Sequence, residues 1–299
     1  MKKLILDLRG NTGGYLRAAI FMADAFLEEG KLIVYTKGKN RPEKKHFAKG
    51  HGEFEKQELI ILINENSASA AEIVAGAIQD NDRGLVIGRR SFGKGLVQEQ
   101  LDFSDGSAIR ITVARYYTPT GRCIQRPYDD GKEAYYADHY HQMLDDMKHK
   151  KDSIPDSLKF TTPQGKIVYG GGGIMPDIVI PVDTNISYYL YNQLIRKSII
   201  VEFAIDYYNH HKKSFENYKD IPDFYNQYSI KPNVYEDLIE IVKQQGVKTS
   251  KVEIADSKKI ILNSFQSELG RLLFGDEAYH YIYLQEDKAF NQSKALLQK

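Results

Sequence analysis

Residues 59–80 read LIILINENSASAAEIVAGAIQD, and this stretch decides the fold class. Its first five residues form a continuous apolar run, which is typical of a strand buried inside a sheet. The polar turn that follows leads into Ser69–Gln79, where alanines dominate and the spacing is helical. A buried strand that turns directly into a small-residue helix indicates an α/β protein.

The same alternation of strand and helix extends to both sides of this stretch. Short apolar runs predict further strands, whereas Tyr15–Glu29 has helical apolar spacing and stops at Gly30, a favourable helix cap. Residues 37–57 are charged and show no periodicity, so we expect a loop there. This order predicts a sheet that is buried on both faces. The expected strands are residues 4–6, 31–36, 59–63 and 85–87.

The pattern changes after residue 95. Residues 96–117 alternate with a period of two around the turn Ser104–Gly106, which predicts a β-hairpin. Residues 122–168 are polar and predict a surface insertion, after which IMPDIVIPV (174–182) returns to strand. From about residue 183 the spacing is helical and includes twelve of the 21 tyrosines, enough aromatic surface for a separate core. We therefore expect two domains, residues 1–186 and 187–299.

Composition excludes several classes of function. The 299 residues carry a net charge of +1, and this lack of excess positive charge gives no indication of a nucleic-acid partner. Cys123 is the single cysteine, and no apolar run reaches the 18 residues that a membrane span needs. The sequence begins MKKLILDLRG without the apolar stretch and cleavage site of an export signal. We expect that further residues precede Met1 in the natural precursor.

Ser69 is a candidate nucleophile because of its place at the start of a predicted helix. Unpaired N–H groups and a partial positive potential at a helix N-terminus stabilise an oxyanion. The structural alternative is equally well formed, because Ser69 and Glu72 also match a capping box. Ser67 lies two residues earlier and could attack as well, although its hydroxyl suits a bond to the local backbone.

Lys94 is a candidate general base for that serine. It lies between two glycines in SFGKGLVQ (91–98), an unusual setting for an ordinary surface charge. A lysine can replace histidine as the base of a serine nucleophile if its amine is uncharged, a form that burial favours. Gln98 follows four residues later and would share a face with Lys94 on a strand, where its amide could orient the amine.

Two other readings of these residues are weaker. Residues 88–94 match GxxxxGK, but Gly95 stands where a phosphate-binding loop has Ser or Thr, and a strand pattern follows instead of a helix. A histidine base is the second reading, yet all eight histidines lie in polar loops or helical stretches, and no metal-ligand spacing occurs. We therefore expect neither a nucleotide, a metal nor another cofactor. The histidines are residues 46, 51, 139, 141, 149, 210, 211 and 280.

Five motifs in order resemble the carboxy-terminal processing peptidases, or tail-specific serine proteases. They are LILDLRGNTGG, NENSASAAEIVAGAIQDNDRGLVIG, SFGKGLVQ, ARYYTPTGRCIQ and GGGIMPDIVI, within about residues 4–183. The resemblance implies a crotonase-like α/β protease core with a β-hairpin subregion, followed here by a helical C-terminal domain. Members usually carry an upstream peptide-binding PDZ domain and further core strands before the first of these motifs, and we expect this chain to lack them.

The resemblance also implies roles for particular residues. Ser69 would be the nucleophile, Lys94 the general base and Gln98 the residue that positions the lysine. The oxyanion hole would use the backbone N–H of Ala70 and that of Gly13 or Gly14, between which the sequence does not decide.

A function follows from the resemblance as an expectation. The protein would be a serine endopeptidase that cleaves near the C-termini of partly unfolded proteins, in the bacterial cell envelope or periplasm as part of a longer precursor. Two alternatives use the same fold: a catalytically silent peptide-binding module and a crotonase-like acyl transferase. The helices of residues 187–299 exceed what the sheet needs, so we expect them to mediate self-association.

Overall fold

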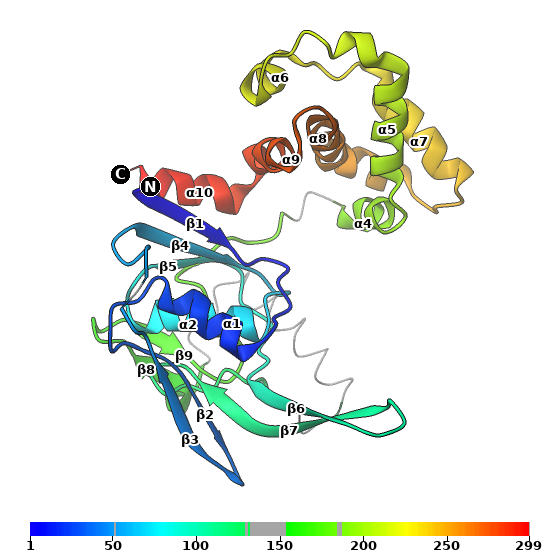
Figure 1. The fold of residues 1–299 in the computed structure, drawn as a ribbon. Helices are drawn as coiled ribbons and strands as arrows, with labels where there is room; N and C mark the ends of the chain where they lie inside the picture. The colour runs from blue at the N-terminus through cyan, green and yellow to red at the C-terminus, as the bar shows by residue number, and fades with distance from the viewer. Residues whose placement is uncertain (51, 129–130, 132–153, 184–186, 299) are drawn as a thin grey trace. The chain divides into compact units, whose positions relative to one another are not determined.

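The computed structural model describes residues 1–50, 52–128, 131, 154–183 and 187–298. The chain divides into two compact units (Figure 1), and each is described by itself. The first comprises Met1–Pro181 and also Ser293–Lys299, and the second comprises Val182–Gln292. The last seven residues thus group with the first unit, unlike in the predicted division at residue 186. None of the helices in the described part of the chain combines the length and apolar character of a membrane span.

Four short parallel strands form the central sheet of the first unit. Its order is β1-β4-β5-β10, and every neighbouring pair is parallel. Residues on one face, such as Ile61 and Val86, and on the other, such as Leu62 and Ile87, are all buried. The prediction of a sheet buried on both faces is confirmed for these central strands. The strands are β1 (Lys3–Asp7), β4 (Glu58–Ile63), β5 (Leu85–Gly88) and β10 (Ile178–Val179).

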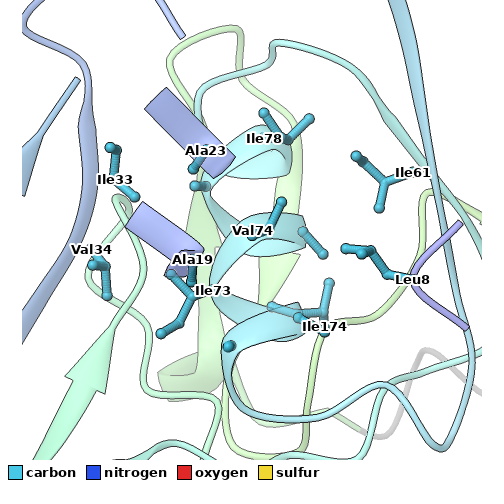
Figure 2. Packing of buried hydrophobic residues seen from close by; sticks show 14 of the residues in the cluster. Leu8, Ala19, Ala23, Ile33, Val34, Ile61, Ile73, Val74, Ile78 and Ile174 are labelled. Atoms are coloured by element: carbon cyan, nitrogen blue, oxygen red, sulfur yellow. The ribbon is translucent and has the colours of Figure 1, made fainter. Parts of the chain in front are cut away.

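Two helices, α1 (Leu16–Asp24) and α2 (Ala70–Asp80), pack together within the core of this unit (Figure 2). Alanines on both helices are buried at the contact, and every residue of α2 is buried. The helix predicted for residues 15–29 is shorter because the Ala25 carbonyl accepts the Phe54 N–H at 3.1 Å instead of a helical one. Small side chains allow the close approach, and the surrounding Ile and Val residues fill the core.

An antiparallel sheet in the order β3-β2-β7-β6 makes up another part of the unit. The hairpin predicted for residues 96–117 is confirmed, since β6 and β7 pair around Gly106 at φ 85°. The loop predicted for residues 37–57 is wrong in part, because it contains β3. This strand is almost wholly exposed and charged, so hydrophobic alternation could not reveal it. The strands are β2 (Leu32–Gly38), β3 (Arg41–Phe47), β6 (Leu96–Asp102) and β7 (Ala108–Tyr117).

The predicted insertion at residues 122–168 lies partly outside the described residues. Its first residue is not a surface residue, because Arg122 is fully buried, as is Arg126. Its last part forms the short 3₁₀ helix η2 (Asp156–Leu158) and a two-stranded sheet. In that sheet β8 (Lys159–Thr161) pairs with β9 (Ile167–Tyr169). The prediction that residues 122–168 form a surface insertion is therefore wrong for the start of this segment, where two arginines are buried.

The second unit is helical, as predicted, and its long helix α8 (Lys251–Phe274) contacts α4, α5, α6, α7 and α9. Ser250 and Glu253 form a capping box that starts α8, and Gly275 ends it with φ 88°. The core is strongly aromatic: Phe265 meets Phe203 with ring centroids 5.3 Å apart. The other helices of this unit are α4 (Tyr188–Arg196), α5 (Ile199–His211), α6 (Ile221–Gln227), α7 (Asn233–Gln244) and α9 (Asp276–Tyr283), with short 3₁₀ turns η3 (Lys212–Ser214) and η4 (Leu284–Glu286). Helix α10 (Lys288–Leu297) begins in the second unit, and its residues from Ser293 on belong to the first.

Candidate active site

Three loops meet at the carboxyl ends of the parallel strands. They are residues 8–15 after β1, residues 64–69 after β4 and residues 89–95 after β5. Backbone hydrogen bonds join them: the Ala68 N–H donates to the Asn11 carbonyl and the Phe92 N–H to the Ser67 carbonyl, both at 2.9 Å. Open parallel sheets bind ligands at this edge. The predicted site residues Gly13, Gly14, Ser69, Ala70 and Lys94 all lie in these loops or immediately after them.

Ser69 occupies the sharp turn between β4 and α2. Its backbone has φ 56° and ψ −112°, a conformation that residues with a side chain rarely adopt. Such strain persists only where the surrounding structure imposes it, and it concentrates at functional turns. Ser69 is half-buried, whereas Ala70 begins the helix behind it. The turn therefore presents a serine at the positive end of α2.

Gly13 and Gly14 differ in their surroundings. A Cβ on Gly13 would lie 2.7 Å from the Ser69 Cβ and 3.2 Å from the Ala70 nitrogen, and its φ is 111°. A Cβ on Gly14 would meet no atom within 4 Å. The Gly13 N–H already donates to the Asn11 side chain at 2.9 Å. Gly13 is thus the glycine that permits close approach to the serine.

Glu72 is fully buried and joins the segments that carry the serine and the lysine. Its Oε2 accepts the backbone N–H groups of Ser69 and Lys94, at 2.8 and 2.9 Å. Its Oε1 accepts the Gly93 N–H at 2.7 Å and the Ser91 hydroxyl at 2.5 Å. Burial raises the pKa of the Glu72 carboxyl, and these four hydrogen bonds oppose that rise. The capping-box pattern was the sequence signal for Glu72, but it indicated only the bond to Ser69.

Lys94 and Gln98 lie on either side of the start of β6. Lys94 is half-buried and precedes β6, which starts at Leu96, while Gln98 is exposed within that strand. The pairing of β6 with β7 shifts register between Val97 and Gln98. The additional residue of this shift, Val113, lies on β7, and Lys94 precedes β6, so the shared face of Lys94 and Gln98 stays a prediction. Within the described chain, neither the Lys94 amine nor the Gln98 amide makes a hydrogen bond.

The alternative residues have other structural roles. The Ser67 hydroxyl is fully buried, donates to the Leu8 carbonyl at 2.8 Å and accepts the Asn64 N–H at 3.0 Å, as expected of a turn residue. A strand follows Lys94, and the Glu72 carboxylate already binds the N–H groups that a phosphate would need. Among the histidines that the structure describes, none hydrogen-bonds to a residue of the three loops.

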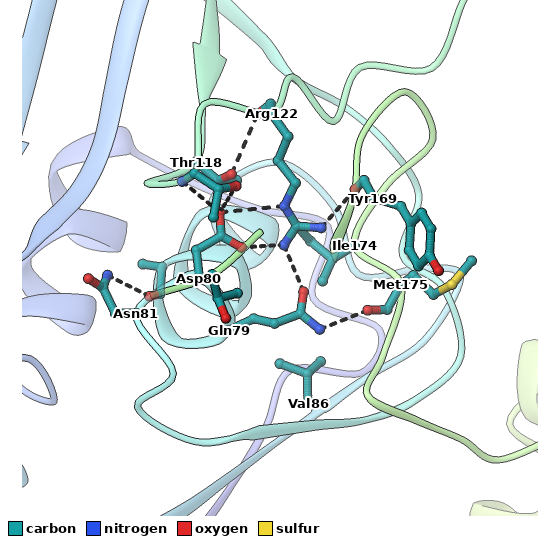
Figure 3. Close-up of polar contacts among 12 residues, drawn as sticks. Gln79, Asp80, Asn81, Val86, Thr118, Arg122, Tyr169, Ile174 and Met175 are labelled. Carbon is teal, nitrogen blue, oxygen red and sulfur yellow. Dashed lines mark hydrogen bonds and ion pairs between the residues drawn. The ribbon is translucent and has the colours of Figure 1, made fainter. Parts of the chain in front are cut away.

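Arg122, whose burial the sequence did not predict, secures the far end of α2 (Figure 3). Its guanidinium pairs with the equally buried Asp80 at 2.6 Å and donates to the Gln79 side chain at 2.7 Å and the Tyr169 carbonyl at 2.7 Å. The Asp80 carboxylate also accepts the Thr120 N–H and hydroxyl. The helix that carries the serine is thereby held at both ends.

A serine at a strained strand-to-helix turn, facing a glycine loop, is the arrangement of a serine-nucleophile site in an α/β protein. Residues 1–130 match peptidase family S41, and residues 190–275 match a family of unknown function, DUF8443. The predicted resemblance to the carboxy-terminal processing peptidases is thus confirmed for this part of the chain.

Individual relatives agree with that match. A carboxy-terminal-processing protease of Bartonella bacilliformis is 47% identical over 126 residues, which cover 42% of this chain and 29% of the relative. The corresponding Synechocystis protease is 45% identical over 122 residues, covering 41% and 28%. The solved photosystem II D1 C-terminal processing protease superposes with a TM-score of 0.42 at 29% identity, over 60% of this chain and 35% of that one. The matches to the two relatives thus cover less than a third of each relative's length.

Proposed function

We propose that this chain carries the catalytic centre of a serine endopeptidase that uses Ser69 and Lys94. The observation that supports it most is the pair of bonds from Glu72, which hold the Ser69 and Lys94 backbones on one carboxylate oxygen. Residues 25 positions apart in the sequence are thus neighbours at the serine turn. The S41 match of residues 1–130 covers this whole centre.

The chemistry follows from the residue types. As the Ser69 Oγ attacks the scissile carbonyl carbon, its proton passes to the neutral Lys94 amine and the carbonyl electron pair moves onto oxygen. When the C–N bond breaks, Lys94 returns that proton to the leaving amine, which leaves an ester on Ser69. Water then hydrolyses the ester with Lys94 again acting as base. Gln98 is proposed to orient the amine from β6.

The oxyanion would form between the helix and the glycine loop. Among the described residues, the N–H groups of Ala70 and Gly14 have no hydrogen-bond partner, whereas the Gly13 N–H is bound to Asn11. We therefore propose Ala70 and Gly14 as the two donors. Gly13 would serve by leaving space beside Ser69, because a side chain there would fill it.

A fluorophosphonate probe tests the nucleophile directly. It should modify the protein at Ser69, as located by mass spectrometry, and Ser69→Ala and Lys94→Ala should each lower peptide hydrolysis by about 10³-fold or more. The double variant should be no worse than either single one, since the two residues act together. Lys94→Arg should also fail, because a guanidinium remains charged.

Ser67→Ala is the matched control at the same turn, with folding followed by circular dichroism. Activity that survives in Ser69→Ala but is lost in folded Ser67→Ala would make Ser67 the nucleophile. A folded protein that binds peptide, but neither cleaves it nor reacts with the probe, would support the peptide-binding module. Turnover of an acyl-CoA without peptide hydrolysis would support the acyl transferase.

For the substrate, we propose flexible C-termini of partly unfolded proteins, bound as an extended strand. The names of the relatives, which describe C-terminal processing, support this choice. A peptide with a free C-terminal carboxylate should be cleaved faster than the same peptide amidated. Equal rates for the two peptides would contradict recognition of the C-terminus.

Two further proposals concern the rest of the chain. The helices of residues 187–299 would mediate self-association, and light scattering that shows a folded monomer at high concentration would contradict this. We also propose the bacterial cell envelope as the location, on the family resemblance. Fractionation of cells that express the natural gene, followed by immunodetection in the envelope or cytosolic fraction, tests the location.

A further inference from the structure

Tyr116, near the end of β7, lies between the serine and lysine segments. Its side chain is fully buried, and its hydroxyl is 3.1 Å from the Ser69 carbonyl oxygen and 2.7 Å from the Lys94 carbonyl oxygen. Its own backbone N–H donates to the Gly95 carbonyl at 3.0 Å. One tyrosine of the antiparallel sheet thus contacts the backbone of both proposed catalytic residues.

This contact complements that of Glu72. The carboxylate accepts the N–H groups of Ser69 and Lys94, while the Tyr116 hydroxyl shares its single proton between their two carbonyl oxygens. Burial, and secondarily the nearby Glu72, raises the pKa of Tyr116 well above its ordinary value, so the hydroxyl keeps its proton at neutral pH. The backbones of the two residues are therefore fixed by one acceptor and one donor.

We propose that Tyr116 is a positioning residue that sets the separation of Ser69 and Lys94. This inference rests on the proposed function of that pair. The antiparallel sheet fixes Tyr116 in turn, since it pairs with Thr36 of β2. Without the hydroxyl, no side chain from this sheet would bind the two carbonyl groups, and the lysine segment would move relative to the serine turn.

Tyr116→Phe tests this with the removal of one oxygen atom, and Tyr117→Phe is the matched control. Tyr117 is the adjacent residue, and its ring stacks on Tyr35 with centroids 4.8 Å apart, a contact that phenylalanine retains. Rates are measured on the full chain and normalised to sites titrated with the fluorophosphonate. We expect kcat to fall about tenfold or more in Tyr116→Phe, with KM within about twofold, because a small misplacement of reacting groups is costly. Tyr117→Phe should match the parent protein.

Amide hydrogen exchange gives a readout that does not need activity. Tyr116→Phe should accelerate exchange at Ser69, Gly93 and Lys94, and Tyr117→Phe should not. Unchanged exchange and unchanged normalised kcat in Tyr116→Phe would overturn the positioning role. If the parent protein neither hydrolyses peptide nor reacts with the probe, the proposed function fails, and exchange alone decides whether Tyr116 holds the two segments. An equal loss of kcat in both variants would also reject the specific role of Tyr116.

Discussion

A carboxyl group is buried at each end of helix α2, but the two have different hydrogen-bonding and charged partners. At the C-terminal end, Asp80 pairs with the guanidinium of Arg122, and both side chains are fully buried. At the N-terminal end, Glu72 is equally buried but receives only N–H and O–H donors, from Ser69 and three residues of the loop after β5. One end carries an ion pair, and the other a buried carboxyl group that receives hydrogen bonds but has no positive charge paired with it.

The ion pair at Asp80 fixes the end of the helix, whereas the hydrogen bonds to Glu72 assemble the candidate active site. In the buried ion pair each charge is compensated by the other. The pair joins the turn of residues 118–122 to the end of α2, and Arg122 also binds the Tyr169 carbonyl of β9. Donors without a positive charge leave the Glu72 carboxyl sensitive to burial, as its raised pKa reflects. These hydrogen bonds set the geometry of the site, because the backbone N–H groups of Ser69 and Lys94 both donate to the Oε2 atom of Glu72.

The largest effect is expected at the ion-paired end. Asp80→Asn should lower the free energy of unfolding of the first unit by about 3–5 kcal/mol, because it leaves the Arg122 charge buried without a counter-ion. Urea denaturation followed by circular dichroism measures the change. The control is Glu43→Gln, since Glu43 lies 3.9 Å from Lys37 and 3.4 Å from Lys45 in largely exposed ion pairs, and this change should cost no more than about 1 kcal/mol. An equal loss of unfolding free energy in Asp80→Asn and Glu43→Gln would contradict the stabilising role of the buried ion pair.

A smaller effect is expected where the glycine loop meets the serine turn. Gly13→Ala should destabilise the protein by about 1–3 kcal/mol, because its Cβ would lie 2.7 Å from the Ser69 Cβ at a φ of 111°. Gly14→Ala meets nothing within 4 Å and should stay within about 0.5 kcal/mol. Thermal denaturation compares the two variants. A larger loss in Gly14→Ala would contradict the close approach of Gly13.

The smallest effect is a pH dependence of stability at the Glu72 end. Because the folded-state pKa of Glu72 is raised, the folded protein holds its proton to higher pH than the unfolded chain does. The associated stability is complete below the ordinary value of 4.5 and is lost as the pH rises through the folded-state pKa.

Glu72→Gln should remove this slope, which is at most about 1.4 kcal/mol per pH unit. Glu53→Gln, at an exposed position, is the control and should keep it. Denaturation curves between pH 4 and pH 8 test the expectation. A slope of equal size in Glu72→Gln and the parent protein would assign it to other groups.

Local sequence pattern predicted several elements. The apolar run of β4 and the alanine-rich helix α2 were predicted because their residues are buried. The largely exposed β6–β7 hairpin was predicted from its alternating residues and the turn at Ser104–Gly106. The exposed, charged β3 was missed because it shows neither signal. Its partner β2 and the hydrogen bonds between them, not its own side chains, make it a strand.

The sequence by itself determined the α/β class, the helical second unit, the resemblance to carboxy-terminal processing peptidases and the candidates Ser69 and Lys94. Only the tertiary structure decided what surrounds them: Glu72 binding both backbones, Tyr116 between their carbonyl groups, and Gly13 against the serine. The physical reason is distance along the chain. Periodicity and turn residues record neighbours a few positions apart, whereas a buried carboxylate or hydroxyl finds partners that only folding brings within 3 Å.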